Sequence, residues 1–388
     1  MKTENKNVEY KICKRCVMDS TTNLISFDDD GICNFCKEYE IVAEKTFKRP
    51  LSEREKEIGE LITKLKAHGK NNEYDCIIGM SGGMDSSYLA VWAYENKIKP
   101  LIVHFDNGWN SEMAVKNIEN VVNKCGFDLN TYVINWEQFK ELQLAYFRAS
   151  VIDIEVPTDQ LILASLFKIA KERNIKMILS GNNVVTETIL PKDWLWWNKW
   201  DIVNLRNIYK KFGNASIKEF PTLSKKDYFK YTERDRIKTY TVFDKLGFDL
   251  NYVKKKLSIE YNYKLYEYKH YESVFTRFYQ GYILPKKFKV DKRKAHLSNL
   301  VMAGFITRDD ALSDLKKPTY PEDIQKNDLE YVLKKWGMSS EEFERIMNKK
   351  PVPHEMFGVE KVPLRKKINK KIELIYKYKI LKPLGLYK

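Results

Sequence analysis

Short apolar runs alternate with helix-forming stretches between residues 74 and 180, and this alternation indicates the fold. Residues 74–80 form an apolar run rich in β-forming side chains, and residues 86–94 carry large apolar residues at helical density. The alternation continues with strands expected at 100–105, 130–134 and 176–180, and with helices expected at 111–124, 136–149 and 159–173. Such β-α-β repetition places helices on both faces of a parallel sheet. We therefore predict an α/β domain that binds ligands at the carboxyl ends of its strands.

The rest of the pattern divides the chain into further regions. We expect an N-terminal cysteine knuckle at residues 1–47, a linker helix at 48–73 and the α/β domain at 74–185. A substrate-binding region should follow at 186–315, and a mostly helical, basic C-terminal region at 316–388. The linker helix is predicted from Ile58, Leu61, Ile62 and Leu65, because their spacing places them on one helix face.

The charge of the chain is concentrated at its C-terminus. Of the formal net charge of +15, residues 361–388 contribute +9, with ten Lys or Arg residues and one acidic residue. The remaining 360 residues carry only +6, which weakens a nucleic-acid-binding interpretation. From Val362 onward the tail has the pattern of an amphipathic basic helix. Its role as a solvated helix, a docking site for a partner protein or a peripheral contact with anionic lipid stays open.

Four of the six cysteines form two pairs, Cys13 with Cys16 and Cys33 with Cys36, separated by sixteen residues. No signal peptide is visible and no apolar run reaches 18 residues, so we expect a cytoplasmic protein in a reducing compartment. Two CxxC turns at this spacing then favour a structural, tetrahedral zinc site over disulfides. Residues 28–31 read as a turn that returns the second pair to the first.

The connection between the first strand and its helix has the composition of an anion-binding loop. Its residues are Ser81, Gly82, Gly83, Met84, Asp85, Ser86 and Ser87. Adjacent glycines allow backbone N–H groups to converge on a phosphate at a helix start, and the serines add hydroxyl donors. Asp85 offers a carboxylate for a magnesium ion. The loop lacks the Lys-Ser/Thr ending of a Walker A motif, so kinase and GTPase designs are disfavoured.

The sequence SGGMDS resembles the PP-loop of the ATP pyrophosphatases, which cleave ATP to AMP and pyrophosphate while adenylating a carbonyl oxygen. The resemblance implies an adenine nucleotide alpha hydrolase-like fold. It also implies that the ends of two other strands line the nucleotide, at His104, Phe105, Asp106, Gly181 and Asn182.

Asp159 has two possible roles at the start of its predicted helix, where Thr158 is the expected N-cap. It either compensates the helix dipole or supplies a second carboxylate for magnesium or the phosphate network. The tryptophans at residues 194–200 suit a ligand ring, a helical subdomain or a subunit interface.

Residues 269–312 carry a second concentration of charged and hydroxyl side chains among large apolar residues. The candidate substrate-binding residues are Lys269, Glu272, Arg277, Lys292, Arg293, His296 and Arg308, and His270 and Lys294 are candidate catalytic residues alongside Asp85 and Asp159. Such side chains can bind the phosphates of a substrate and the leaving pyrophosphate, although a basic helical surface is the alternative.

Taken together, the CxxCVMD start, the second CxxC, the GMSGGMDSSY loop and the KHYESVFTRFYQGYILPKKF segment resemble the N-acetyl sugar amidotransferases, over residues 10–315. This family belongs to lipopolysaccharide and nonulosonic acid biosynthesis. The resemblance implies ATP and Mg²⁺ as cofactors, a nucleotide-linked N-acetyl sugar as substrate, and ammonia from a separate glutaminase and synthase-like pair. A base such as His270 would deprotonate the incoming ammonium.

The alternative is a PP-loop enzyme that thiolates tRNA, because some of these also carry zinc knuckles. Such enzymes usually need further cysteines near the active site. Here Cys76 and Cys125 are the two that remain, and neither is expected at the carboxyl end of a strand.

Overall fold

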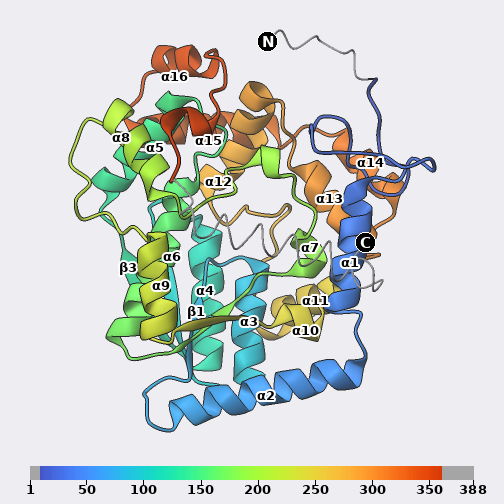
Figure 1. The fold of residues 1–388 in the computed structure, drawn as a ribbon, viewed down its shortest axis with the longest axis vertical. Coiled ribbons are helices and arrows are strands. Elements are labelled where there is room, and N and C mark those ends of the chain that lie inside the picture. The colour runs from blue at the N-terminus through green and yellow to red at the C-terminus, as the bar shows by residue number, and fades with distance from the viewer. Residues whose placement is uncertain (1–8, 361–388) are drawn as a thin grey trace, which may run out of the picture.

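The computed structural model describes residues 9–360, and the predicted basic helix from Val362 onward lies outside the described residues. Within them, one parallel sheet of five strands has the order β3-β2-β1-β4-β5 (Figure 1). Its strands are β1 (Cys76–Gly79), β2 (Pro100–Asp106), β3 (Asp128–Val133), β4 (Met177–Ser180) and β5 (Lys238–Thr241). The predicted α/β fold with a parallel sheet is confirmed.

Helices cover both faces of the sheet, as β-α-β repetition requires. On one face, α3 (Met84–Glu95) and α4 (Glu112–Cys125) share a core with Ile78 and Ile102. On the other face, α6 (Val156–Glu172) packs against the neighbouring residues of the same strands. Because both faces are buried, β1 and β2 read as continuous apolar runs and not as an alternating pattern.

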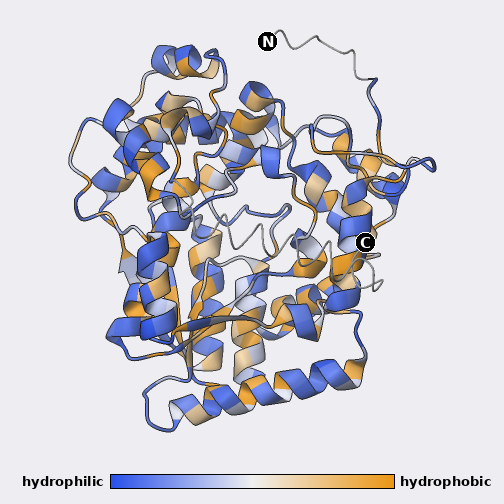
Figure 2. Cartoon of the chain, viewed as in Figure 1, coloured by the Kyte–Doolittle hydropathy of each residue, from blue (hydrophilic) through white to orange (hydrophobic). Residues whose placement is uncertain are grey.

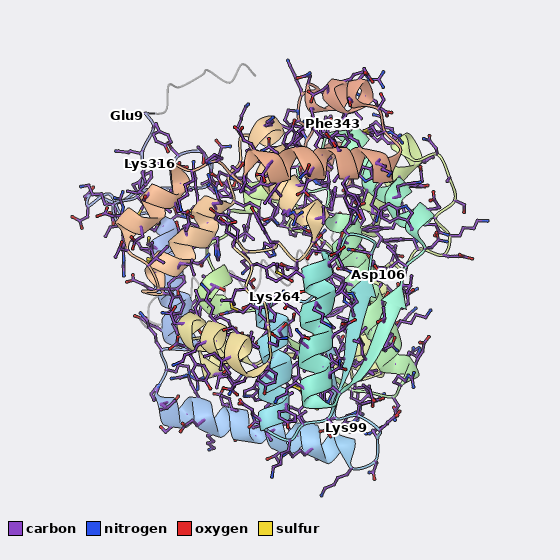
Figure 3. The ribbon with its side chains drawn as sticks, turned by 180° about the vertical axis from the view of Figure 1, so that it is seen from behind. Glu9, Lys99, Asp106, Lys264, Lys316 and Phe343 are labelled. Atoms are coloured by element: carbon purple, nitrogen blue, oxygen red, sulfur yellow. The ribbon has the colours of Figure 1, made fainter. Side chains whose placement is uncertain are left out.

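A layer of helices lies beyond the carboxyl edge of the sheet. Figure 3 shows this direction, since Lys99 lies beside α2 whereas Asp106, at the end of β2, faces the upper helices. The layer includes α5 (Trp136–Ala149), α8 (Ile202–Phe212), α12 (Val274–Phe278), the π-helix η3 (Tyr279–Phe288), α13 (Arg293–Met302), α14 (Arg308–Leu315), α15 (Glu322–Trp336), α16 (Ser340–Met347) and the 3₁₀-helix η4 (His354–Phe357).

The N-terminal knuckle leads into α1 (Asn34–Lys45) and then into α2 (Leu51–Gly69), which crosses the opposite end of the sheet (Figure 1). Leu61 and Leu65 are buried, as expected for the predicted linker helix. In Figure 2 hydrophilic and hydrophobic colours alternate along α2, which fits a helix that packs by one side.

Two features differ from the sequence prediction. The fifth strand comes from beyond the predicted α/β range 74–185, because β5 pairs with β4. In addition, α6 begins at Val156 with Glu155 as N-cap, so Thr158 lies inside the first turn and the predicted cap is wrong.

Shorter helices complete the chain: α7 (Val184–Glu187), η1 (Lys192–Trp194), α9 (Lys225–Phe229), η2 (Lys230–Arg234), α10 (Phe243–Leu246) and α11 (Leu250–Glu260).

Among the helices of residues 9–360, none is both long and apolar enough to cross a membrane.

Candidate functional site

A cavity of about 1400 Å³ opens at the carboxyl edge of the sheet. The loop after β1, the ends of β2 and β4, the start of α6, residues 263–280 and one side of α13 form its wall. Pockets for a single small ligand usually measure about 300–1,000 Å³. The cavity therefore has room for a nucleotide and a second ligand together.

Many of the residues expected from the sequence line this cavity. They are Ser81, Gly83, Met84, Asp85, Ser86, Phe105, Asp159, Gly181, Asn182, Lys269, His270, Glu272, Lys292 and His296. They come from six separate stretches of the chain, so the fold brings the predicted nucleotide-binding residues together with those predicted from residues 269–312.

Hydrogen bonds and one close backbone contact hold the loop after β1 in shape. Gly82 has a φ of +82°, and a Cβ there would lie 2.6 Å from the carbonyl oxygen of Ala114, so glycine is required. The hydroxyls of Tyr263 and Tyr266 donate to the Gly82 carbonyl oxygen at 2.9 and 3.2 Å. The Ser86 hydroxyl donates to the Gly83 carbonyl oxygen at 3.2 Å. These contacts hold the loop backbone, while Ser81, Gly83 and Met84 line the cavity.

Three predicted nucleotide-binding side chains, those of Ser87, His104 and Asp106, lie outside the described cavity lining. His104 is buried, with Nδ1 3.0 Å from the carbonyl oxygen of Met80, immediately before the loop. Ser87 is fully buried, and an Asp106 carboxylate oxygen accepts a hydrogen bond from the N–H of Gly108 at 2.9 Å. Nucleotide contact by these three side chains stays a prediction, while their structural contacts are with the protein.

The first charged group of the cavity, which we call the loop pole, consists of Asp85, Glu187 and Lys269. Lys269 Nζ lies 2.6 Å from Glu187 Oε1 and 3.9 Å from Asp85 Oδ2. Burial raises the pKa of Asp85 to about 6, against the opposing effect of Lys269. Burial would lower the pKa of Lys269, but the two carboxylates outweigh it and raise that pKa. An ammonium therefore stands beside the first turn of α3, where a phosphate would bind.

The segment around His270 lies against the loop, since a Cβ on Gly83 would be 3.1 Å from Glu272 Oε1. His270 has a φ of +68°, in the left-handed region that side chains other than glycine adopt less often. Its Nδ1 lies 3.7 Å from Glu272 Oε1. Burial favours the neutral form of Glu272, but His270 and Lys269 together outweigh it and lower the Glu272 pKa. The backbone is fixed by Ser111 N–H donating to the Glu272 carbonyl oxygen at 2.9 Å and Val274 N–H to that of Trp109 at 2.8 Å.

A second charged group lies elsewhere on the wall and was largely missed by sequence reasoning. This acidic pole consists of Asp153, Glu155, Asp159, Lys199 and Lys292. Lys199 Nζ contacts a carboxylate oxygen of Asp153 and lies 2.9 Å from Asp159 Oδ2. Only Asp159 and Lys292 were predicted as site residues. The others sit in an irregular stretch before α6 and among the tryptophans, where no motif marks them.

Four predicted basic residues have partners within the protein and do not line the cavity. Arg277 donates to both carboxylate oxygens of Asp328 at 2.6 and 2.7 Å, and Arg293 donates to Asp291. Lys294 contacts Asp19, and Arg308 Nη2 donates to the carbonyl oxygen of Cys13 at 2.9 Å. Substrate binding or catalysis by these residues stays a prediction, because each cation is engaged in holding the fold.

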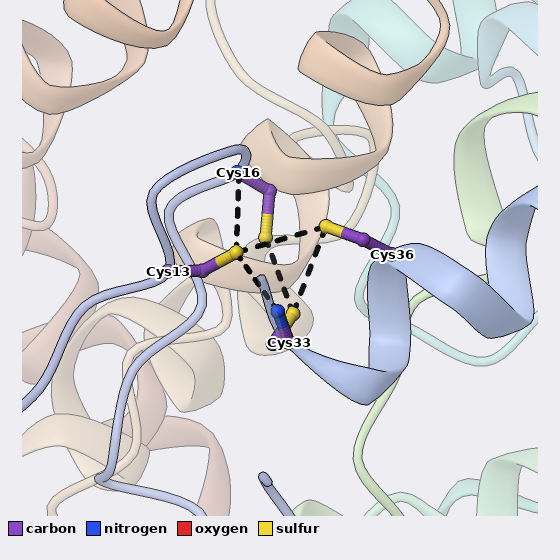
Figure 4. Close-up of side chains that lie close together, drawn as sticks. All are labelled: Cys13, Cys16, Cys33 and Cys36. Carbon is purple, nitrogen blue, oxygen red and sulfur yellow. Dashed lines mark hydrogen bonds between the residues drawn. The ribbon is translucent and has the colours of Figure 1, made fainter. Parts of the chain in front are cut away.

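The predicted cysteine cluster has the geometry of a tetrahedral metal centre (Figure 4). Cys13, Cys16, Cys33 and Cys36 are fully buried, and three Sγ–Sγ distances between them are 3.7–3.8 Å. A tetrahedron with metal–sulfur bonds of about 2.3 Å has edges of about 3.8 Å. Backbone N–H groups point at the sulfurs, including that of Cys33 at 3.2 Å from Cys13 Sγ, as suits thiolates. The residues therefore fit a metal ion.

The other two cysteines have the surroundings of packing residues. Cys76 and Cys125 are buried and are absent from the described lining of the cavity. Burial raises the pKa of the Cys76 thiol well above its usual range and that of Cys125 to about 12.

Comparison with known proteins places the C-terminal part of the chain. Residues 272–373 match the family model described as "LPS biosynthesis protein WbpG-like, C-terminal domain". No curated protein gives a significant match to the chain.

Solved structures give distant likenesses. One is a predicted subunit of tRNA methyltransferase from Methanocaldococcus jannaschii, with 15% identity, a TM-score of 0.27, and coverage of 47% of this chain and 74% of that chain. Another is NMN synthetase from Francisella tularensis, with 13% identity, a TM-score of 0.29, and coverage of 57% and 100%. At such TM-scores the likenesses carry no argument about function.

Proposed function

We propose that this chain, which carries a WbpG-like C-terminal domain of LPS biosynthesis proteins at residues 272–373, is an ATP-dependent amidotransferase of surface polysaccharide biosynthesis. It converts the acetamido group of a nucleotide-linked N-acetyl sugar into an acetamidino group. The observation that carries the proposal is the position of this domain's first residues. Glu272 is bonded to Ser111 and lies against the loop after β1, so the domain and the loop share one cavity.

The chemistry begins at the loop pole. An amide carbonyl is a poor electrophile, so its oxygen must first become part of a leaving group. The amide oxygen attacks the α-phosphorus of ATP, which forms an O-adenylyl imidate and releases pyrophosphate. The loop's N–H groups and the ammonium of Lys269 stabilise the charge of the departing pyrophosphate. Ammonia then adds to the imidate carbon, and AMP leaves with the former amide oxygen.

Two metal ions fit this proposal. Asp85, at the start of α3, would hold Mg²⁺, which neutralises phosphate charge when bound. The four-cysteine cluster would hold Zn²⁺ in a purely structural role, because four thiolates fill a tetrahedral coordination sphere.

The ammonia would come from solution or from a partner protein. The partner that we propose is a glutaminase with a synthase-like subunit. We expect both to act with this chain in the cytoplasm, where ATP is available.

The tRNA-thiolation alternative has less support in the structure. It calls for a reactive thiol near the nucleotide, whereas Cys76 and Cys125 are buried away from the described cavity lining with raised pKa values.

The decisive experiment measures AMP and pyrophosphate release from ATP with Mg²⁺ and ammonium across UDP- and CMP-linked N-acetyl sugars, with product masses. We expect AMP formation that depends on one sugar, and a product in which NH replaces oxygen. AMP formation that depends only on tRNA and a sulfur donor would contradict the proposal. If neither a sugar nor tRNA gave turnover, the proposal would also be contradicted for the isolated chain. Repeating the assay with the glutaminase pair would then test the partner requirement.

A further inference from the structure

We propose that the acidic pole receives the nitrogen donor as ammonium and that Glu155 accepts its proton before attack on the activated carbonyl. This inference rests on the proposed function and identifies the site and the base of its second half-reaction. Sequence reasoning had suggested His270 for this role.

The charge of the acidic pole favours a small cation. Asp153, Glu155 and Asp159 bring three carboxylates, against the two amines of Lys199 and Lys292. Lys199 contacts Asp153 and Asp159, so its charge is shared by those two. An ammonium ion at Glu155 would offset the remaining negative charge of the acidic pole, and its four N–H groups can donate to carboxylate oxygens.

Glu155 is the carboxylate left available. Its Oε1 accepts a hydrogen bond from the Thr276 hydroxyl at 2.6 Å, and within residues 9–360 its Oε2 receives none. Burial raises the pKa of Glu155, an effect that Lys292 opposes. Burial also lowers the pKa of Lys292, against the opposing effect of Glu155. A carboxylate with a raised pKa is the stronger base.

A second feature of this wall also calls for a ligand. The indole N–H of Trp194 is buried and has no hydrogen-bond partner among the described residues, although Trp194 lines the cavity at only 2% exposure. A buried donor without a partner is unfavourable, so a ligand acceptor such as a substrate oxygen is expected there; ammonium only donates and does not fill this role. The cavity wall thus carries a buried hydrogen-bond donor as well as the carboxylates and amines of the acidic pole.

The two poles lie close enough to act on one substrate. Glu272 lies beside the loop, where a Cβ on Gly83 would be 3.1 Å from its Oε1. Thr276, whose hydroxyl donates to Glu155, lies four residues further along the same segment, in the first turn of α12, which Ser273 caps. One short segment of the cavity wall thus joins the loop to Glu155, and we place the imidate carbon between them.

The proton balance is simple. The carboxylate of Glu155 takes one proton from ammonium and becomes a carboxylic acid, and the nitrogen lone pair forms the new C–N bond. The C–O bond to AMP breaks, and the proton returns to solvent when AMP leaves.

The test uses the full chain with Glu155→Gln, which keeps the shape and the Thr276 contact but cannot take the proton. Sugar-dependent exchange of labelled pyrophosphate into ATP reports the first half-reaction, and we expect it to stay within a few-fold of native. Amidine formation with ammonium should fall by about 10²-fold or more. Hydroxylamine, already unprotonated at neutral pH, should still give amidoxime at a near-native rate.

Glu330→Gln is the matched control, because Glu330 is an exposed carboxylate outside the described cavity lining and all three rates should stay near native. Equal loss with ammonium and hydroxylamine, or an ammonium rate within a few-fold of native, would overturn the role of Glu155. If native protein showed no sugar-dependent exchange, the proposed function would fail, and the inference with it.

Discussion

Helix α13 separates a closed region from an open one. On one side, Lys294 contacts Asp19 and the Ser298 hydroxyl accepts from Val17 N–H at 3.2 Å, so this side holds the cysteine knuckle. On the other side, Lys292 and His296 line the cavity. Lys294 and Ser298 have their polar groups bonded to the knuckle. On the cavity side, polar atoms such as His296 Nδ1 have no partner in the described chain.

This difference separates stability from chemistry. A region whose polar groups are satisfied within the protein contributes to the free energy of folding. A region that keeps unpaired donors and buried charges loses stability and gains the ability to bind. Substitutions on the knuckle side should therefore change metal content and unfolding, and substitutions on the cavity side should change turnover.

The largest expected effect is on the knuckle side. Cys33→Ser removes one thiolate from the cluster, and metal binding of this kind contributes about 10 kcal/mol to folding. We expect loss of zinc and a large loss of soluble, folded protein, measured by metal analysis and thermal unfolding. Cys125→Ser is the control, since Cys125 lies outside the cluster, and normal zinc content in Cys33→Ser would contradict the assignment.

On the cavity side, Asp85→Asn should reduce pyrophosphate release by about 10²-fold or more, because it removes the proposed magnesium ligand beside the phosphates. Zinc content should be unchanged. The measurement is AMP formation with saturating sugar and ammonium. Near-native turnover would remove Asp85 from the mechanism.

The same substitution should show that the cavity lowers stability. Burial raises the Asp85 pKa to about 6, above the usual value for an unfolded chain, so ionised Asp85 destabilises the folded state. Without ligands, Asp85→Asn should add about 3 kcal/mol to the free energy of unfolding at pH 8. The gain should disappear as the pH falls from about 6 to about 4. Urea unfolding at several pH values tests this, and an equal gain at all pH values would contradict it.

A smaller effect is expected where the knuckle meets α14. Arg308 donates to the carbonyl oxygens of Cys13 and Cys16 at 2.9–3.1 Å. Arg308→Gln should lower the free energy of unfolding by about 2 kcal/mol, because two carbonyls lose charged donors. Pyrophosphate exchange by the folded fraction should stay near native. A selective loss of substrate affinity would instead restore the predicted binding role of Arg308.

Local patterns were sufficient for much of this molecule. The apolar runs predicted four of the five strands, since β1 to β4 fall within the expected ranges or overlap them. The cysteine spacing predicted the cluster, and the Gly-Gly sequence predicted the loop. Each of these signals lies within a few residues of the chain, where backbone geometry alone determines what is possible.

Signals that depend on distant partners were not available. β5 was missed because its half-exposed KTYT sequence pairs with a strand nearly sixty residues earlier. Lys294 was assigned to catalysis and Lys292 to substrate binding, but two residues turn a helix by about 200°, so Lys292, the N-cap of α13, and Lys294 face opposite sides of it. Glu155 and Lys199 were missed because only the fold brings residues before α6 beside those after α7.

The contact between Arg308 and Cys13 also has a consequence for synthesis. The two residues are 295 positions apart, so the knuckle leaves the ribosome long before the helices that cover it exist. At about 5–20 residues per second, the delay is roughly 15–60 s. During this time the apolar surface around Val17 has no Leu297 to pack against, which makes the nascent knuckle a natural client for a chaperone.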